Sequence, residues 1–227
     1  MSKPSLKLIT TQDGSHSLLR EDLNETYHSF HGAMGESVYV FIEQCLDPWV
    51  KANPGEPVKI FEVGFGTGLN AWLAAIYSQQ HQLKVEFHTV EPIPVPKGIY
   101  SQFNYGQSAE QKDLLQKIHD AEWETLIEIH SFFSIIKYET TLEAFSATEG
   151  FNCIFFDAFA PSKQAEVWSI DNIQKCYDIC AEDGILSTYC AQGQFKRNLK
   201  AAGFAMETLK GAMGKKEMVI GRKSISE

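Results

Sequence analysis

A run of apolar, β-prone residues ends on a carboxylate about two-thirds of the way along the chain. The segment reads FNCIFFDAFAP, from Phe151 to Pro161, and its acid is Asp157. Aspartate is seldom buried without a partner, so a ligand is one candidate partner and a turn or helix cap is the alternative. Such a carboxylate can accept an N–H from a bound amine and orient the nitrogen lone pair. Phe159 and Pro161 would form an apolar wall that stacks on a flat base or excludes water.

A second segment, EVGFGTGLN, has the composition of a ligand-binding turn. Glu62 is followed by Gly64, Gly66, Gly68 and Asn70. The spacing G-x-G-x-G differs from the G-x-G-x-x-G of dinucleotide sites, and no G-K-[ST] of a P-loop follows. An acid before alternating glycines, at the end of a first strand, is typical of S-adenosylmethionine sites. We therefore assign these five residues to cofactor binding, with a simple packing turn as the alternative.

Two further acids stand at predicted strand ends. Glu91 lies about 20 residues beyond the glycines, where a carboxylate accepts hydrogen bonds from two ribose hydroxyls. Glu139 lies where a polar contact to an adenine amino group is expected, and a surface acid is equally consistent with its position. No acceptor for a 2′-phosphate is evident near Glu91, which disfavours NADP.

The elements that must position these residues alternate between strand and helix after residue 57. The predicted strands are 58–63, 83–91, 131–139, 151–157 and 184–190, with a closing hairpin of 203–210 and 216–221. The predicted helices are 68–80, 107–128 with a break near Asp120, 141–145, 169–181 and 194–202. This alternation predicts an α/β fold: a mostly parallel seven-stranded sheet covered by helices, with one antiparallel strand from the hairpin at an edge.

Residues 1–56 form an N-terminal extension in this interpretation, and 57–227 form the main domain. Asp13-Gly14 stands between two short apolar runs, which predicts a β-hairpin. Residues 36–51 repeat apolar side chains at helical spacing, and Pro48 is expected to kink or end that helix.

The stretch YHSFHGAMGES, residues 27–37, places Tyr27, two histidines and a glutamate together. His28, His31 and Glu36 could bind a metal ion, but no third strong ligand stands at a known spacing, so no metal is expected. Glu36 at the start of a helix is the simpler interpretation.

The composition describes an ordinary globular protein that is 44% hydrophobic and 22% charged over 227 residues. No apolar run approaches the roughly 18 residues of a membrane helix, and the N-terminus has no secretory signal. Five cysteines without a C-x-x-C indicate reduced thiols, no disulfides and a cytoplasmic location. Oligomeric state is not readable from these features.

Charge is unevenly distributed along the chain. The net charge is −9, whereas residues 196–223 hold eight basic and two acidic residues, Lys215 and Lys216 among them. This asymmetry suggests a face that meets an anionic partner, with an ordinary solvated face as the alternative.

Several segments together resemble one known family, the MnmC-like methyltransferase domain of tRNA modification. They are DGSHSLL (13–19), ETYHSFHGAMGESVYVF (25–41), FEVGFGTGLNAW (61–72), FFDAFAPSKQAEVW (155–168), STYCAQGQFKRNLKAAGF (187–204) and GAMGKKEMVIG (211–221). The glycine loop is common to many methyltransferases, whereas the D-x-F-A-P-x-K and Y-H-S-x-x-G-A-x-x-E patterns are much more specific. The bifunctional members continue into an oxidase domain, so a chain of 227 residues resembles the stand-alone form.

The resemblance implies a Rossmann-like class I methyltransferase fold with S-adenosylmethionine as methyl donor. It implies tRNA carrying 5-aminomethyl-2-thiouridine at the wobble position as acceptor, and the 5-methylaminomethyl form as product. Asp157 would orient the acceptor amine, Tyr27 and His28 would close over cofactor or substrate, and Lys215 and Lys216 would contact tRNA phosphates.

Three other functions fit parts of the same pattern. A small-molecule amine methyltransferase or a polyamine aminopropyltransferase would also use an acidic pocket beside a strand-end aspartate. A non-catalytic cofactor-binding or RNA-binding protein would keep the fold without the chemistry, although the intact glycine loop, Glu91 and Asp157 argue against it. A nicotinamide dehydrogenase is disfavoured by the glycine spacing.

Overall fold

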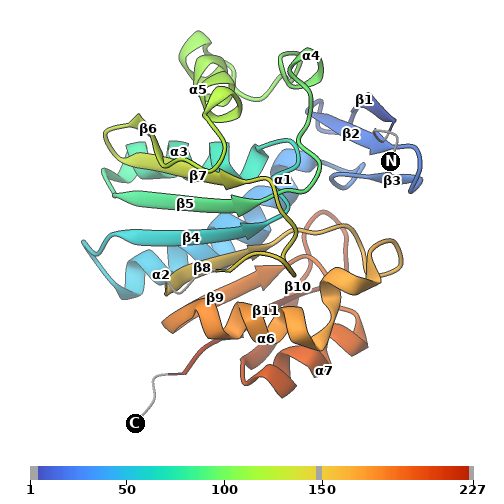
Figure 1. Ribbon diagram of the computed structural model, residues 1–227, viewed down its shortest axis with the longest axis vertical. Helices are drawn as coiled ribbons and strands as arrows, with labels where there is room; N and C mark the ends of the chain where they lie inside the picture. Colours follow the sequence, from blue (N-terminus) through green and yellow to red (C-terminus); the bar gives the residue numbers. More distant parts are fainter. Residues whose placement is uncertain (1–4, 147–149, 225–227) are drawn as a thin grey trace.

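The computed structural model describes residues 5–146 and 150–224. An eight-stranded sheet of order β10-β11-β9-β8-β4-β5-β7-β6 forms the centre, and a three-stranded sheet of order β1-β2-β3 lies beside it (Figure 1). The predicted α/β fold, with its mostly parallel sheet and small N-terminal hairpin, is confirmed.

The N-terminal segment forms the small sheet and one continuous helical run. Strands β1 (Leu6–Thr10), β2 (His16–Arg20) and β3 (Glu25–Thr26) are antiparallel. The helical run contains α1 (Ala33–Ser37), the π-helical η1 (Val38–Leu46) and α2 (Asp47–Ala52). Pro48 does not end this run, because it lies in the first turn of α2, where a missing N–H matters least.

Five parallel strands form the middle of the large sheet. They are β4 (Val58–Val63), β5 (Val85–Val90), β7 (Phe133–Tyr138), β8 (Phe151–Phe156) and β9 (Cys180–Thr188). The connecting helices are α3 (Leu69–His81), α4 (Lys97–Tyr100), α5 (Ala109–Asp120), η2 (Ala165–Trp168), α6 (Ile170–Ile179) and α7 (Gly193–Ala202).

The structure differs from the sequence prediction in two strands near the sheet edges and in two predicted helices. Strand β6 (Ile127–His130) pairs antiparallel with β7, so the sheet has eight strands where seven were predicted. The helix predicted for 107–128 ends at Asp120, the suggested break, and residues 141–145 form turns and no helix. The antiparallel β11 (Glu217–Arg222) lies between β9 and the edge strand β10 (Ala205–Lys210), one position inside the edge.

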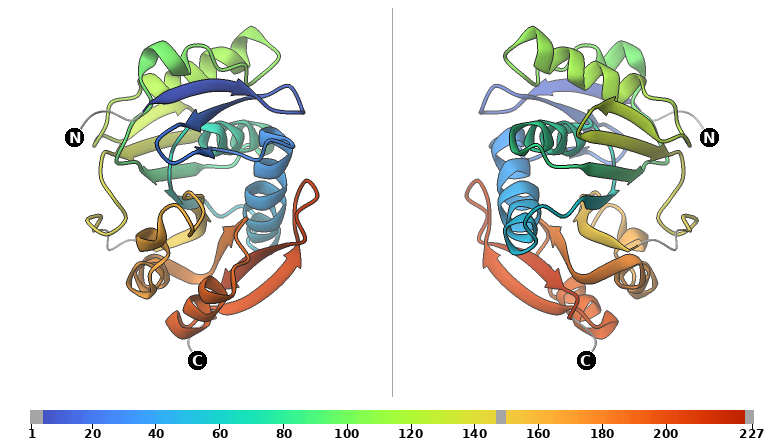
Figure 2. Two further views of the ribbon diagram at one scale, coloured as in Figure 1. Left: turned by 90° about the vertical axis from the view of Figure 1, so that its right-hand side faces the viewer. Right: turned by 90° about the vertical axis from the view of Figure 1, so that its left-hand side faces the viewer.

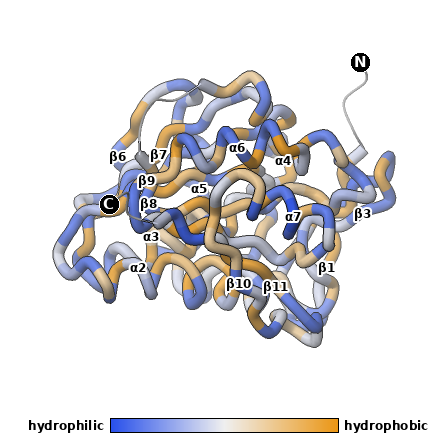
Figure 3. The backbone as a smooth tube through the Cα atoms, turned by 90° about the horizontal axis from the view of Figure 1, so that it is seen from below, coloured by the Kyte–Doolittle hydropathy of each residue, from blue (hydrophilic) through white to orange (hydrophobic). Residues whose placement is uncertain are grey.

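Both faces of the sheet are covered, which explains the long apolar strands. Alternate residues belong to opposite cores: Ile60 and Phe155 pack under η1 and α3, whereas Phe61 and Phe156 pack under α6 and α7. Figure 2 shows the helical run of residues 33–52 in blue and α6 in orange on opposite sides of the sheet. Helices in Figure 3 change between hydrophilic and hydrophobic colour along their length, as amphipathic helices on a sheet do.

Because β4, β5, β7, β8 and β9 are parallel, their carboxyl ends meet at one edge of the sheet. The small N-terminal sheet is attached there by loops that follow two of these strands. Tyr105 donates its hydroxyl to the carbonyl of His16 at 2.8 Å, and Lys163 Nζ donates to the carbonyl of Leu23 at 2.8 Å. The N-terminal segment therefore covers the edge at which an open α/β sheet binds ligands.

Candidate active site

A cavity of about 360 Å³ lies at this edge, within the range of small-ligand sites. Nine of the fourteen predicted site residues line it: Tyr27, His28, Gly64, Gly66, Asn70, Glu91, Asp157, Phe159 and Lys215. The other five do not line it: Glu62, Gly68, Glu139, Pro161 and Lys216. Most residues predicted from the sequence patterns thus lie around one cavity at this edge of the sheet, whereas five do not line it.

The glycine loop is built for close backbone approach. Gly64 has φ +95°, and a Cβ there would lie 2.8 Å from the carbonyl oxygen of Asp157. Gly66 has φ +50°, and its Cβ would lie 2.9 Å from the Tyr27 ring. Gly68, with φ +70°, begins α3 and packs against His119, so it shapes the loop without lining the cavity. Side chains at these positions would close the cavity, which fits a loop that touches a cofactor through its backbone.

Glu91 joins the loop to the next strand end. Its Oε2 accepts the N–H of Gly66 at 3.0 Å and its Oε1 accepts the N–H of Ile93 at 2.9 Å. Burial raises the pKa of this carboxyl, and the two backbone donors oppose the rise. Each oxygen keeps a further lone pair, because a carboxylate has about four acceptor positions. A ribose diol therefore fits this carboxylate.

Asp157, itself half-buried, ends a chain of polar groups that runs into the protein interior. Asn70 Nδ2 donates to Asp157 Oδ2 at 2.8 Å and to Glu62 Oε1 at 3.0 Å, and Thr89 Oγ1 donates to Glu62 Oε2 at 2.7 Å. Glu62 is fully buried behind the cavity wall, so it holds the Asn70 amide and does not itself line the cavity. Burial raises the pKa of Glu62 to about 8 and that of Asp157 to about 7. The Asp157 carboxyl is thus poised to exchange a proton near neutral pH.

An aromatic wall faces the acid. The Tyr27 and Phe159 rings meet edge to face with centroids 4.8 Å apart, and the Arg20 guanidinium lies 5.8 Å from the Phe159 centroid. His28 Nδ1 lies 3.1 Å from Ser17 Oγ. Burial lowers the pKa of His28 to about 4, so this imidazole is neutral at pH 7. Pro161 lies just beyond the wall and does not line the cavity, because Ala160 occupies the expected place.

Three further polar side chains line the cavity. They come from distant parts of the chain, and no sequence motif links one to another. Glu36 comes from α1, Tyr189 follows β9, and Lys215 comes from the β10–β11 turn. Lys215 forms an ion pair with Glu36 and lies 4.3 Å from the centroid of the Tyr189 ring. Lys215, predicted to contact tRNA phosphates, thus has its ammonium paired with Glu36 at the cavity, and its side chain stays about one-third exposed.

Glu139, which was predicted to contact adenine, does not line the cavity. The Glu139 side chain is exposed, and its backbone N–H donates to Glu124 Oε1 at 2.8 Å. That end of the cavity is lined by Thr141, Leu142 and Glu143 instead. Strand β7 ends at Tyr138, so Glu139 lies in the bend that follows it and its side chain is exposed to solvent.

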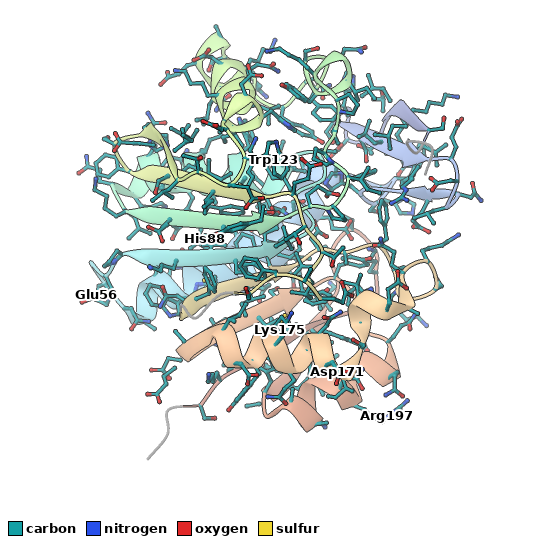
Figure 4. All side chains as sticks on the ribbon, viewed as in Figure 1. Glu56, His88, Trp123, Asp171, Lys175 and Arg197 are labelled. Carbon is teal, nitrogen blue, oxygen red and sulfur yellow. The ribbon has the colours of Figure 1, made fainter. Side chains whose placement is uncertain are left out.

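The basic C-terminal segment does not form one free surface. Lys196 pairs with Glu217 at 2.6 Å, and Lys223 Nζ donates to the carbonyl oxygens of Tyr177 and Cys180. Arg197, labelled in Figure 4, lies on α7 and donates to Gln194. Exposed members remain on α7, β10, the hairpin turn and β11: Lys200, Lys210, Lys216 and Arg222.

Other classes of site find no support in the parts of the chain that are described, residues 5–146 and 150–224. Within them, no three His, Cys, Asp or Glu side chains are placed to hold a metal ion, and His31 contacts Gln12 instead. The same residues include no helix long and apolar enough to span a membrane. All five cysteines are buried and unpaired.

The fold and the cavity define a class of protein. A family model described as S-adenosyl-L-methionine-dependent methyltransferase matches residues 110–224, just over half of the 227 residues. The chain belongs to this family. The glycine loop and Glu91 lie before the matched residues and line the same cavity as Asp157.

Named relatives and solved structures make the similarity more specific. The chain is 28% identical over 211 residues to the "tRNA 5-methylaminomethyl-2-thiouridine biosynthesis bifunctional protein MnmC" of Marinomonas sp., covering 87% of this chain and 31% of the relative. It is 27% identical to the protein of the same name from Burkholderia multivorans over 232 residues, covering 94% and 34%. The chain thus spans about a third of the length of these relatives. The crystal structure of MnmC2 from Aquifex aeolicus has the same fold, with a TM-score of 0.77, 22% identity and coverage of 100% and 74%.

Proposed function

We propose that this protein transfers a methyl group from S-adenosylmethionine to the amine of 5-aminomethyl-2-thiouridine at the wobble position of tRNA, giving 5-methylaminomethyl-2-thiouridine. The observation that carries the proposal is the half-buried Asp157 carboxylate, which shares one cavity with the glycine loop and Glu91. The names of the similar MnmC proteins supply the acceptor.

The cofactor end of the cavity would be formed by the backbone of Gly64 and Gly66 and by Glu91. Glu91 would accept hydrogen bonds from the ribose hydroxyls, and the two glycines leave room beside Asp157 and Tyr27. Leu142 and Glu143 would line the adenine end in place of Glu139. When bound, S-adenosylmethionine supplies an electrophilic methyl group on a sulfonium.

The acceptor end requires an unprotonated amine held in line with that methyl group. Asp157 would accept an N–H of the amine, and the Asn70 amide fixes the carboxylate by its 2.8 Å hydrogen bond. The Tyr27 and Phe159 rings offer an apolar wall for a base extruded from the tRNA anticodon stack. Neutral His28 would close this wall without placing a cation beside the donor.

A small amine or polyamine is the second candidate acceptor. The observation that favours it is the number of carboxylates lining the cavity: Glu25, Glu36, Glu91, Glu143, Asp157 and Glu166. The spermidine synthase of Thermotoga maritima has a similar fold, with a TM-score of 0.50, 13% identity and coverage of 98% of this chain and 75% of that one. That likeness concerns the fold alone.

Methyl transfer from labelled S-adenosylmethionine to tRNA from cells that lack this modification tests the proposal. The tRNA is digested and its nucleosides are analysed by mass spectrometry, with spermidine and simple amines assayed in parallel. We expect label in 5-methylaminomethyl-2-thiouridine. Label in small amines and none in tRNA would replace the proposed function by the second candidate.

A further inference from the structure

An ammonium group already occupies the acceptor end of the cavity. The turn between β10 and β11, residues 211–216, folds back until the Lys215 ammonium reaches Glu36 and the Tyr189 ring. Met213 packs the same turn against α1: a Cβ on Gly35 would lie 2.9 Å from the Met213 sulfur. Lys215 therefore enters from an anchored turn, and its flexible stem carries a primary ammonium into the site.

Glu36 needs a cation at this position. It is 6% exposed, and its Oε2 accepts the N–H of Ser29 at 3.0 Å. Within the described residues, its buried Oε1 has no hydrogen bond beyond the ion pair with Lys215. A buried carboxylate whose cation left without replacement would be strongly disfavoured. Any molecule that displaces Lys215 must therefore bring its own positive charge.

The same point is adjacent to the proposed catalytic acid. The Tyr189 hydroxyl donates to the carbonyl of Ala158 at 2.8 Å, the residue next to Asp157. The charges of Glu36 and Lys215 both act on the pKa of Asp157, the former raising and the latter lowering it. The Lys215 ammonium is thus within electrostatic range of the group that would orient the acceptor amine.

Among the described residues, a second buried acceptor without a donor lines the cavity beside Asp157. Asn70 is 3% exposed and lines the cavity, and its Oδ1 has no partner among residues 5–146 and 150–224. A primary ammonium has three N–H donors. A primary ammonium could therefore supply donors to the carboxylates and to this amide oxygen, which an anion could not.

We propose that Glu36 and the Tyr189 ring form the binding subsite for the acceptor's primary ammonium, and that the acceptor displaces Lys215 from it. The inference rests on the proposed function, because it names the site that takes the aminomethyl group. One ammonium replaces another when the acceptor binds, so Glu36 stays paired during the exchange. The bound ammonium must then release one proton, which the Asp157 carboxylate can take, before the neutral amine attacks the methyl group. A uridine without an amine cannot make this exchange, and an acceptor carrying a carboxylate would be repelled by Glu36. The subsite thereby selects the aminomethyl form.

The exchange is tested on the unaltered protein by the reactivity of its lysines. A short pulse of an amine-acylating reagent is applied with S-adenosylhomocysteine and either 5-aminomethyluridine or uridine, and acylation of each lysine is measured by mass spectrometry. The ratio of Lys215 to the exposed Lys210 cancels reagent consumed by the free amine. We expect 5-aminomethyluridine to raise this ratio at least about threefold, and uridine to leave it unchanged. An unchanged or lower ratio with the amine would show that Lys215 is a permanent structural partner and would overturn the proposal.

A substitution at Glu36 tests binding of the acceptor's ammonium separately from displacement of Lys215. Glu36→Gln keeps the shape of the side chain and removes its charge, so the preference for 5-aminomethyluridine over uridine, measured by NMR titration, should fall about tenfold or more. Glu207→Gln on the neighbouring β10 is the matched control and should keep the preference. Retention of the preference by Glu36→Gln would contradict the subsite.

The outcomes also distinguish this inference from the proposed function. If 5-aminomethyluridine exposes Lys215 but tRNA accepts no methyl group, the subsite stands and the proposed function fails. If tRNA is methylated and the Lys215 ratio does not change, the proposed function stands and the subsite fails.

Discussion

The two ends of the cavity are built in different ways. The ribose part of the cofactor end comes from one short stretch of chain, residues 64–91, and relies on backbone: glycines that leave room and a Glu91 carboxylate fixed by two amide N–H groups. The acceptor end takes Glu36, Tyr189 and Lys215 from three distant segments and relies on charged and aromatic side chains.

This difference separates a common task from a specific one. A backbone cradle at parallel strand ends suits a cofactor shared by many enzymes, because it depends on the fold more than on individual side chains. Selection among acceptors depends on charge and shape, which side chains from the N-terminal helix and the C-terminal hairpin supply. Changes at the two ends should therefore alter different measured quantities.

The largest effect should follow Asp157→Asn. The amide cannot accept the amine N–H as a carboxylate does, so kcat with tRNA should fall about 100-fold or more, whereas tRNA affinity should change little. Steady-state methyl transfer and filter binding measure the two quantities. Asp171→Asn on the outer surface of α6 (Figure 4) is the control. Near-normal turnover of Asp157→Asn would falsify the orienting role.

Glu91→Gln should act on the cofactor end alone. The amide NH₂ would face the N–H of either Gly66 or Ile93, so two donors would oppose each other there. The side chain would also lose one acceptor oxygen for the ribose hydroxyls. The Kd for S-adenosylhomocysteine, measured by calorimetry, should rise about 10- to 100-fold. Binding of 5-aminomethyluridine should be unaffected, and a parallel loss of both affinities would break the separation of the two ends.

The rate should depend on pH through the acceptor end. Burial raises the pKa of Asp157 to about 7, and the carboxylate form is the one that accepts the amine N–H. The single-turnover rate should therefore rise about tenfold between pH 6 and pH 8 and then level off. In Asp157→Asn this titration should disappear. If the variant kept the same profile, the titration would belong to another group, such as the acceptor amine.

Glu62→Gln should change stability in a pH-dependent way. Burial raises the pKa of Glu62 from 4.5 to about 8, so its contribution to stability is full below pH 4.5 and is lost as the pH rises to about 8. The isosteric amide has no charge to bury, so the variant should match the wild type near pH 4.5 and exceed it by roughly 2–4 kcal/mol above pH 8. Denaturant unfolding across this range measures the difference. Glu56→Gln, an exposed site labelled in Figure 4, should show no such trend.

The smallest effect should come from the exposed basic residues. Lys216→Ala should weaken tRNA binding a few-fold and reduce the slope of log affinity against log salt by about one unit. Lys112→Ala on α5 is the control. Lys112 is exposed, and α5 lies near the β6 end of the sheet, opposite the end that carries the β10–β11 hairpin (Figure 1). Equal slopes for both variants would mean that tRNA does not bind along the hairpin.

Local patterns were sufficient for much of the fold. Strand β4 begins and ends where the sequence predicted, and α3, α6 and α7 lie within two residues of their predicted bounds. The extra strand β6 was not predicted, because its four residues gain their hydrogen bonds from β7 and carry little pattern of their own. Pro48 was expected to interrupt the helix, but the turn in which it falls tolerates it.

For the site, sequence patterns were enough to bring Gly64, Gly66, Glu91 and Asp157 to one cavity. Carboxyl ends of parallel strands meet at one edge of a sheet, so residues at or just after those ends can come together there. The tertiary structure alone decided the acceptor end. Nothing in the local sequence links Glu36 to Lys215, and nothing turns Glu139 away from the cavity. Glu36 and Lys215 meet because α1 and the β10–β11 hairpin pack against each other. The buried Glu36 carboxylate then pairs with the opposite charge that this packing brings within reach.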